Sequence, residues 1–274
     1  MSGFDVSDAR VVVTGASAGL GRALSVQLAE RGARVALVAR GEDALRRLAT
    51  ELEGRAQHPP LVVAADLSEP GTPAAVAAHV LEEFGCVDLL VNNAGSHFVE
   101  SLARVGDGPS GRELFELHLW APLALTSEVL PTMLANGRGA ILNVTATMEN
   151  LPIPFAGYYT ASKSAIAQAT RVLRHELRHT PIRVIEFSPG PNDTAARKLG
   201  TAAVPWKTGP PPMFPSSPES SAAAVLRALE RGAERITHPA FARIQAEVPV
   251  LGRFIAAIAA RQIDTSRPVA RPTS

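Results

Sequence analysis

The sequence predicts an α/β fold in which a single domain is built on a doubly wound parallel sheet with helices on both faces. Two observations predict it. Short, continuously apolar segments rich in Val, Leu and Ile alternate with longer amphipathic segments, and no shift in composition divides the first 190 residues. Strands buried on both faces have this continuous apolar character, and their alternation with helices indicates right-handed crossovers between parallel strands.

The predicted elements follow one another along the chain. Strands are expected at residues 10–13, 34–39, 61–65, 87–91, 140–144 and 182–187, where apolar runs are bounded by Gly, Pro or Asn. Helices are expected at residues 21–31, 42–53, 72–84, 112–134, 157–179, 219–231 and 239–261. The last of these carries an apolar stripe at spacings of three and four, for which we expect packing on the core or across a symmetric interface; a membrane-surface role is a further alternative.

The pattern changes after Pro189 and Gly190. Residues 205–218 are rich in proline and are incompatible with a regular element. We therefore predict one domain over residues 1–264, with residues 191–218 as a flap over the ligand crevice and residues 265–274 as a disordered tail. A loose connection is the alternative for the flap.

Composition and charge exclude several classes of protein. The 274 residues carry 27 Lys and Arg against 26 Asp and Glu, without the clustered positive charge of nucleic-acid binders. The single cysteine, Cys86, cannot form an internal disulfide, which indicates a reducing compartment. The longest segment without a charged residue has 13 residues, too few for a transmembrane helix, and the N-terminus lacks a signal-peptide core. We expect a soluble cytoplasmic protein that has no metal site.

A glycine-rich turn, TGASAGLGR at residues 14–22, joins the first predicted strand to the first helix. Glycines let the backbone turn tightly and approach a bulky anion, and the helix N-terminus behind them offers unpaired N–H groups and partial positive charge. The turn predicts a dinucleotide-phosphate site formed by Gly15, Ser17, Gly19, Leu20 and Gly21. A glycine-rich connection without a ligand is the alternative.

The end of the second strand bears on which dinucleotide binds. A carboxylate there holds the ribose hydroxyls of NAD, whereas an arginine suits the additional phosphate of NADP. Arg40 occupies this place, and no carboxylate precedes Glu42. The sequence therefore favours NADP over NAD, unless Arg40 is only a solvated residue at a strand end.

Tyr159 and Lys163 are four residues apart in a predicted helix, so both side chains lie on one helical face. An ordinary tyrosine has a pKa near 10, and a neighbouring ammonium favours the phenolate. We expect Lys163 to lower the pKa of Tyr159, which prepares the phenol to exchange a proton with a carbonyl or alcohol oxygen.

Further motifs occur in the same order: Asp66-Leu67, then Asn92-Asn93-Ala94-Gly95, then Tyr159-Thr-Ala-Ser-Lys163, then Pro189-Gly190. Together with the glycine-rich turn, they make residues 11–194 resemble the short-chain dehydrogenase/reductase family, whose fold is Rossmann-like. The resemblance implies a nicotinamide cofactor, a small-molecule substrate and a homodimer or homotetramer.

The resemblance also implies roles for individual residues. Tyr159 is the acid or base, and Lys163 additionally holds the nicotinamide ribose. Asp66 and Leu67 flank the adenine, and Asn93, Ala94 and Gly95 line the cofactor near its ribose. Pro189, Gly190 and Thr194 contact the nicotinamide end. The alternatives are a structural cap for Asn93 and a helix N-cap for Asp66.

Two positions depart from the family pattern. The family serine that polarises the substrate oxygen lies thirteen residues before the tyrosine, and Ala146 occupies that position without a donor. The family asparagine of the proton relay is replaced by His118, which can itself relay a proton. Thr147 or Thr145 is a candidate replacement for the missing hydroxyl.

These residues predict an NADP-dependent oxidoreductase that transfers hydride between nicotinamide and a carbonyl or alcohol. Two alternatives remain: non-redox acid–base chemistry on the same scaffold (cyclisation, elimination or isomerisation), and a catalytically weak nucleotide-binding partner subunit. Apolar residues at 150–155, with Trp206 and Phe214, favour a hydrophobic substrate. His97 is a candidate for the substrate pocket, although a lone histidine is more often structural.

Overall fold

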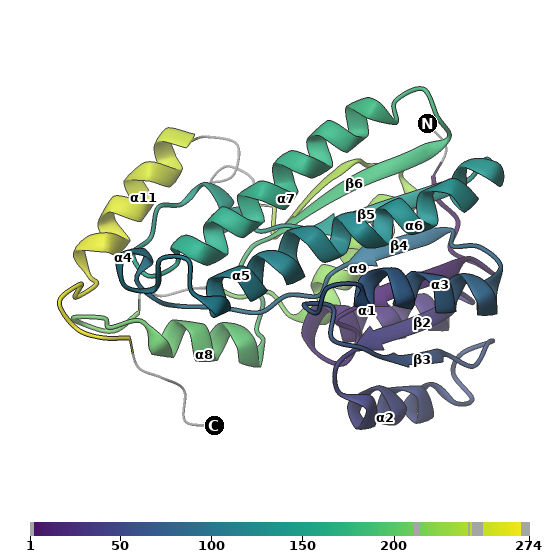
Figure 1. The fold of residues 1–274 in the computed structure, drawn as a ribbon, viewed down its shortest axis with the longest axis horizontal. Coiled ribbons are helices and arrows are strands. Elements are labelled where there is room, and N and C mark those ends of the chain that lie inside the picture. The colour runs from purple at the N-terminus through teal and green to yellow at the C-terminus, as the bar shows by residue number, and fades with distance from the viewer. Residues whose placement is uncertain (1–2, 211–213, 241, 243–248, 270–274) are drawn as a thin grey trace.

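Residues 3–210, 214–240, 242 and 249–269 are described by a computed structural model of the chain (Figure 1). The described strands form one sheet of order β3-β2-β1-β4-β5-β6-β7, and every neighbouring pair is parallel. The strands are β1 (Arg10–Thr14), β2 (Arg34–Ala39), β3 (Leu61–Ala64), β4 (Leu89–Asn92), β5 (Gly139–Val144), β6 (Ile182–Pro189) and β7 (Arg235–His238).

Helices cover both faces of this sheet, because side chains alternate along each strand. Val11 and Val13 of β1 point into one core cluster, and Val12 between them points into the other. The first cluster is closed by α1 (Gly19–Glu30), α2 (Glu42–Leu52) and α9 (Pro218–Glu230). The second is closed by α3 (Thr72–Phe84), α6 (Ala121–Ala135) and the end of α7 (Gly157–Glu176). The predicted doubly wound parallel sheet is confirmed.

Most predicted elements are present, and α3 has the predicted bounds. The helix predicted at residues 112–134 is instead three pieces: α5 (Pro109–Phe115), a π-helical turn η1 (Glu116–Trp120) and α6. Three short elements were not predicted: α4 (Leu102–Val105), the 3₁₀ turn η2 (Thr147–Asn150) and β7. Each has only four residues, which is too few for a periodic pattern to develop.

The predicted flap at residues 191–218 contains a helix that the sequence did not predict, before the proline-rich segment at 205–218. Thr194 accepts a hydrogen bond from the backbone N–H of Arg197 and begins α8 (Ala195–Ala203). The helix forms because its residues are rich in alanine and no proline lies between Pro191 and Pro205. Beyond α8, the backbone of Lys207 donates to Gln262, so the proline-rich segment is tied to the end of α11 (Pro249–Arg261).

The predicted helix at 239–261 is helical over α11, while residues 241 and 243–248 lie outside the described residues. The expectation that its stripe packs on the core is wrong for Phe254 and Ile258, which are exposed. The smaller Gly252 and Ala256 face inward instead. In the predicted tail, residues 265–269 form turn and irregular structure, and 270–274 are outside the described residues.

The strand order reverses between β1 and β4, and a crevice is expected where the carboxyl ends of these two strands separate. Figure 1 shows α4, α8 and α11 together on the left of the view, opposite β2, β3 and α2 on the right. Among the described residues, no helix combines the length and apolar character needed to cross a bilayer.

Candidate active site

The glycine-rich turn after β1 is bound tightly to the end of β4. Thr14 Oγ1 accepts hydrogen bonds from the backbone N–H groups of Asn93 and Ala94, both at 2.9 Å. Asn93 Nδ2 donates to the Thr14 carbonyl at 2.9 Å. A β-carbon on Gly21 would lie 2.2 Å from the Gly15 carbonyl oxygen, so only glycine lets helix α1 begin this close to the turn.

This turn has the features of a dinucleotide-phosphate cradle. Gly15 and Gly19 have φ values of 66° and 53°, which expose backbone rather than side chains. Helix α1 has no side-chain cap and no acidic residue in its first turn, so its N-terminal N–H groups keep their partial positive charge for an anion. Ser17 lies in the turn, and Leu20 is buried in the first core cluster. The residues present therefore fit the phosphates of a dinucleotide.

Arg40 follows β2 and is exposed, with its guanidinium 3.8 Å from the Asp66 carboxylate. Burial favours a higher pKa for Asp66, but hydrogen bonds from Ser68 and the charge of Arg40 together hold that pKa below its ordinary value. The N-cap of α3 is Gly71, so the alternative of a helix cap at Asp66 is wrong. Leu67 is buried in the second core cluster. An anionic Asp66 and an exposed Arg40, at ion-pair distance from each other, thus flank the end of β2.

Tyr159 and Lys163 lie in the first two turns of α7, at the carboxyl end of β5. Lys163 is buried, and its Nζ donates to the Val144 carbonyl at 2.9 Å. A β-carbon on Gly95 would lie 3.7 Å from this Nζ, so the ammonium is next to the loop after β4. The neighbouring Tyr158 is turned away: its hydroxyl donates to the Gly106 carbonyl at 2.6 Å. Only Tyr159 is left for chemistry.

The predicted lowering of the Tyr159 pKa is wrong in this structure. Burial raises the pKa of Tyr159 to about 12, because the phenolate would lose its hydration. Lys163 gives a hydrogen bond to the Val144 carbonyl. Burial lowers the pKa of Lys163 to about 8, against the opposing charge of Glu149. At neutral pH the site therefore holds a neutral phenol close to a buried ammonium.

Ala146 lies directly after β5 and is buried. The hydroxyls on either side of it are occupied. Thr147 Oγ1 donates to the Pro189 carbonyl at 3.2 Å, and Thr145 Oγ1 contacts the Phe187 carbonyl and Ser188 Oγ. A hydroxyl has a single hydrogen to donate. These two threonines therefore tie β5 to β6.

His118 is placed by the π-helical turn η1, and both of its ring nitrogens have partners. Nε2 accepts the Ser96 backbone N–H at 3.0 Å, so Nδ1 carries the proton and donates to Ser162 Oγ at 2.9 Å. Burial holds the pKa of His118 well below its ordinary value, and Lys163 contributes. The ring lies edge-on to Tyr159, with 5.8 Å between centroids. His118 is thus a fixed neutral residue beneath the site.

The loop after β6 lies beside the glycine-rich turn. The Gly190 N–H donates to the His238 carbonyl at 2.8 Å, and Pro189 accepts from Thr147. A β-carbon on Gly19 would lie 3.1 Å from Thr194 Cγ2, so the start of α8 reaches across the crevice to the turn. The structure thus brings Thr194 to the predicted phosphate site, while Pro189 and Gly190 lie at the end of β6 in contact with Thr147 and His238.

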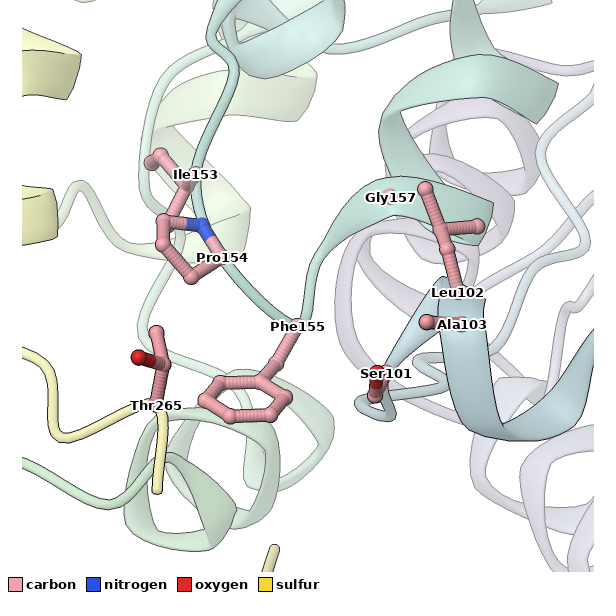
Figure 2. Close-up of a pocket in the computed structure, with 8 residues that line it drawn as sticks. All are labelled: Ser101, Leu102, Ala103, Ile153, Pro154, Phe155, Gly157 and Thr265. Atoms are coloured by element: carbon pink, nitrogen blue, oxygen red, sulfur yellow. The ribbon is translucent and has the colours of Figure 1, made fainter. Parts of the chain in front are cut away.

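A cavity of about 250 Å³ opens next to the start of α7. Figure 2 shows α4 on one side of it and the loop before α7 on the other. Its lining is largely apolar and consists of Ser101, Leu102, Ala103, Ile153, Pro154, Phe155, Gly157 and Thr265. The apolar segment predicted to lie near the crevice therefore lines an actual pocket.

Comparison with known proteins decides the relationship. The family model for short chain dehydrogenases matches residues 9–203. The chain belongs to the short-chain dehydrogenase/reductase family. It is 39% identical over 187 residues to mouse (Mus musculus) dehydrogenase/reductase SDR family member 7B, which covers 67% of this chain and 57% of the mouse protein. It is 32% identical over 252 residues to 11-beta-hydroxysteroid dehydrogenase A of Sesamum indicum, covering 88% and 71%.

Solved structures of the short-chain dehydrogenase/reductase family share the fold. A short-chain dehydrogenase from Streptomyces avermitilis has a TM-score of 0.75 at 28% identity, covering 92% of this chain and 95% of that one. One from Burkholderia cenocepacia in complex with NADP has a TM-score of 0.73 at 28% identity, covering 94% and 99%. L-Sorbose reductase from Gluconobacter frateurii, solved with NADPH and L-sorbose, has a TM-score of 0.74 at 26% identity, covering 85% and 97%.

Sequence reasoning missed two groups at this short-chain dehydrogenase/reductase site. Glu149, in the 3₁₀ turn η2 (Thr147–Asn150), forms an ion pair with Arg171 and acts on Lys163 through its charge. The His97 ring stacks on Tyr159, with 4.6 Å between centroids and 13° between planes. His97 was predicted only as a pocket residue, since stacking between a loop and a distant helix leaves no periodic signal.

Proposed function

We propose that the protein is an NADP-dependent oxidoreductase that transfers hydride between nicotinamide and a carbonyl or alcohol of a hydrophobic small molecule. The observation that carries the proposal is the neutral Tyr159 phenol one helical turn from the buried Lys163 ammonium, at the crevice where the sheet order reverses. The bound cofactor supplies the hydride. The chain spans only 57% of the mouse relative, so the activity is inferred from the site and not from that protein's name.

In the reducing direction, Tyr159 is the proton donor. A pKa raised to about 12 keeps the proton on Tyr159 Oη at neutral pH, ready for a substrate oxygen on which negative charge develops. The Lys163 ammonium, fixed by Val144, stabilises the tyrosinate that results. In our proposal the glycine-rich turn, Asn93, Ala94, Gly95 and the loop after β6 hold the cofactor.

We infer NADP rather than NAD from the residues after β2. Arg40 is exposed, with its guanidinium 3.8 Å from the Asp66 carboxylate, whereas Arg22 of the glycine-rich turn forms a closer ion pair with Glu51. An exposed guanidinium can pair with a phosphate through two parallel hydrogen bonds. Solved relatives that hold NADP or NADPH support the same choice.

The inference of a hydrophobic substrate is supported by the cavity at α4 and α7. Its lining offers apolar side chains with few polar groups, which suits an apolar ring or chain beyond the reacting carbonyl. The Sesamum indicum relative carries the name of a hydroxysteroid dehydrogenase. We further propose that residues 191–218, including α8, form the flap over this substrate within a single domain at 1–264.

Spectrophotometry with NADPH tests the proposal, with benzaldehyde, acetophenone, cyclohexanone and a steroid ketone as substrates. We expect NADPH oxidation with at least one of them, and Tyr159→Phe should lower kcat by about 10²–10⁴ because general acid catalysis is lost. The matched control is Tyr158→Phe, which removes only the hydrogen bond to Gly106 and should keep kcat. Product formation without a change in nicotinamide absorbance would replace the proposal with non-redox acid–base chemistry.

We also propose a homodimer or homotetramer in the cytoplasm. Trp120, Leu134 and Val172 are exposed on η1, α6 and α7, and burying such side chains against a second copy would be favourable. The single cysteine, Cys86, is buried as a free thiol, which suits a reducing compartment. Light scattering of the eluting protein would test the assembly, and a monomer would contradict it.

A further inference from the structure

The substrate oxygen of the proposed reaction needs a second hydrogen-bond donor beside Tyr159. Negative charge develops on this oxygen as the carbon accepts hydride, and losing one aimed donor at such an oxygen costs about 10²–10³ in rate. Ala146 has no donor. Thr147 gives its hydroxyl hydrogen to Pro189, and the Thr145 hydroxyl is occupied by Phe187 and Ser188. Neither threonine hydroxyl beside Ala146 is therefore free to replace the missing side-chain donor.

His97 can provide a hydrogen-bond donor that no described residue uses. Its ring lies parallel to the Tyr159 ring at 4.6 Å, and it forms no hydrogen bond with the described part of the chain. On its other side, a β-carbon on Gly200 of α8 would lie 3.5 Å from His97 Cβ and Cγ. The ring is thus held between Tyr159 and the flap, with its outer edge exposed.

The two histidines around Tyr159 differ in this respect. His118 uses both nitrogens, on Ser96 and Ser162, and is buried. His97 uses neither with any described residue, and it lies on the open side of the phenol. The ring nitrogens of His97 are therefore available to a ligand that lies against Tyr159, whereas those of His118 are not.

We propose that His97 is a catalytic residue that donates a ring N–H to the substrate oxygen protonated by Tyr159, in place of the donor that Ala146 lacks. This role rests on the proposed function. The carbonyl carbon gains the hydride, the oxygen gains the Tyr159 proton, and His97 keeps its own proton. Tyr159 is afterwards reprotonated from water.

The surroundings of His97 keep it in the form that this role needs. The side of the ring facing Tyr159 is shielded from water, and together with the Lys163 charge this lowers the pKa of His97 to about 4. A neutral imidazole has one N–H donor and one acceptor. His97 can therefore donate to the substrate oxygen without adding a second cation beside Lys163.

Three variants separate donation from packing. His97→Phe keeps an aromatic ring against Tyr159 and removes the donor, His97→Ala removes both, and His97→Gln keeps an N–H donor. We expect kcat for carbonyl reduction to fall by about 10² or more in the Phe and Ala variants and by less in the Gln variant. The dissociation constant of NADPH, measured by fluorescence titration, should stay within about twofold in all three.

Ala146→Ser supplies the internal rescue. Added to His97→Phe, it offers a hydroxyl at the position the family uses, and we expect it to restore kcat by about tenfold or more. If His97→Phe keeps wild-type kcat, the proposed role is wrong. If all three variants lose kcat equally and Ala146→Ser restores none of it, His97 is structural and the role is again wrong.

A readout without turnover completes the test. NADP⁺ and cyclohexanone form an unreactive mixture, and nitrogen-15 spectra of histidine-labelled protein report on the imidazole N–H. We expect the signal that is missing in His97→Phe to move when both are added, and an unmoved signal would overturn the role. If the wild type neither binds NADP⁺ nor oxidises NADPH, the proposed function itself fails. If the wild type is active and His97→Phe has the same kcat, only the proposed role of His97 is overturned.

Discussion

The two sides of the crevice are built in different ways. On the nucleotide side, the turn after β1 and the loop after β4 share a network of hydrogen bonds through Thr14 and Asn93. Gly21 packs against Gly15 so closely that no β-carbon fits. Backbone atoms make most of these contacts, so this side keeps its shape whatever lies across from it.

The substrate side is formed by α4, the loop before α7, α8 and α11. Apolar side chains make up much of its surface, and Leu102, Leu199 and Phe254 remain exposed. Hydrogen bonds connect its segments: the Glu100 N–H donates to Phe155, and the backbone of Lys207 donates to Gln262. The family match ends at residue 203, before the proline-rich segment and α11. The difference indicates that the scaffold fixes the cofactor's place and leaves the substrate's place variable.

The largest expected effect comes from a substitution on the nucleotide side. In Gly21→Ala, the new methyl would meet the Gly15 carbonyl at 2.2 Å, so the backbone of the turn must shift. We expect the free energy of unfolding to fall by about 1–3 kcal/mol and NADPH affinity to fall by about 10- to 100-fold. Urea unfolding and NADPH fluorescence titration measure the two quantities.

Gly41→Ala is the control for this substitution. Gly41 precedes α2, and a β-carbon there would make only an ordinary 3.9 Å contact with Ala44. We expect both quantities to stay close to wild type. Equal effects of the two substitutions would show that the nucleotide side is not tighter than its surroundings.

A smaller effect on cofactor affinity is expected at Arg40, an exposed residue of the nucleotide side. In Arg40→Ala, we expect NADPH affinity to fall about tenfold while NADH affinity is unchanged, because one charge-assisted contact with the additional phosphate is lost. Arg46→Ala is the control, since Arg46 is also exposed but pairs with Glu42 on α2. Calorimetry with both cofactors measures the ratio, and an equal loss for NADH would contradict the assignment.

The sequence predicted the nucleotide side better than the substrate side, for a physical reason. A tight turn against a helix N-terminus requires glycine, and a Tyr–Lys pair on one face requires a spacing of four, so both appear directly in the residue order. The bounds of α3 were predicted because its amphipathic pattern runs uninterrupted from Thr72 to Phe84. Local chemistry of this kind is visible without a structure.

Contacts between distant segments had no such signal. The stacking of His97 on Tyr159 joins residues that are 62 positions apart, and the Arg171 pairs with Glu149 and Glu186 join three separate elements. The π-helical turn at His118 differs from an α-helix only in its backbone hydrogen bonds. The pKa of Tyr159 was predicted with the wrong sign because the pair spacing reveals the neighbouring charge but not the burial that outweighs it.

The smallest expected effect is on the pH dependence of the rate. It tests whether the buried carboxylate of Glu149, in η2, supports the charge of Lys163. Burial lowers the pKa of Lys163 to about 8, and the charge of Glu149 works against that lowering. Carbonyl reduction needs the Lys163 ammonium and the Tyr159 proton. The rate is therefore maximal below the pKa of Lys163 and falls as the pH rises through that pKa. Glu149→Gln removes the supporting charge, and we expect the alkaline limb of the rate profile to move to lower pH by about half to one pH unit.

Glu186→Gln is the matched control for Glu149→Gln, because Glu186 also pairs with Arg171 but is not among the groups that shift the pKa of Lys163. The other titratable groups near Lys163, His97 and His118, have lowered pKa values and stay neutral across this range. An equal displacement of the limb in both variants would show that Arg171 transmits the effect, and an unmoved limb in Glu149→Gln would remove Glu149 from the site. A displacement of the limb in Glu149→Gln alone would show that the Glu149 carboxylate in η2 itself sets the pKa of Lys163. The turn η2, which precedes the substrate side, would then contribute charge to the catalytic pair.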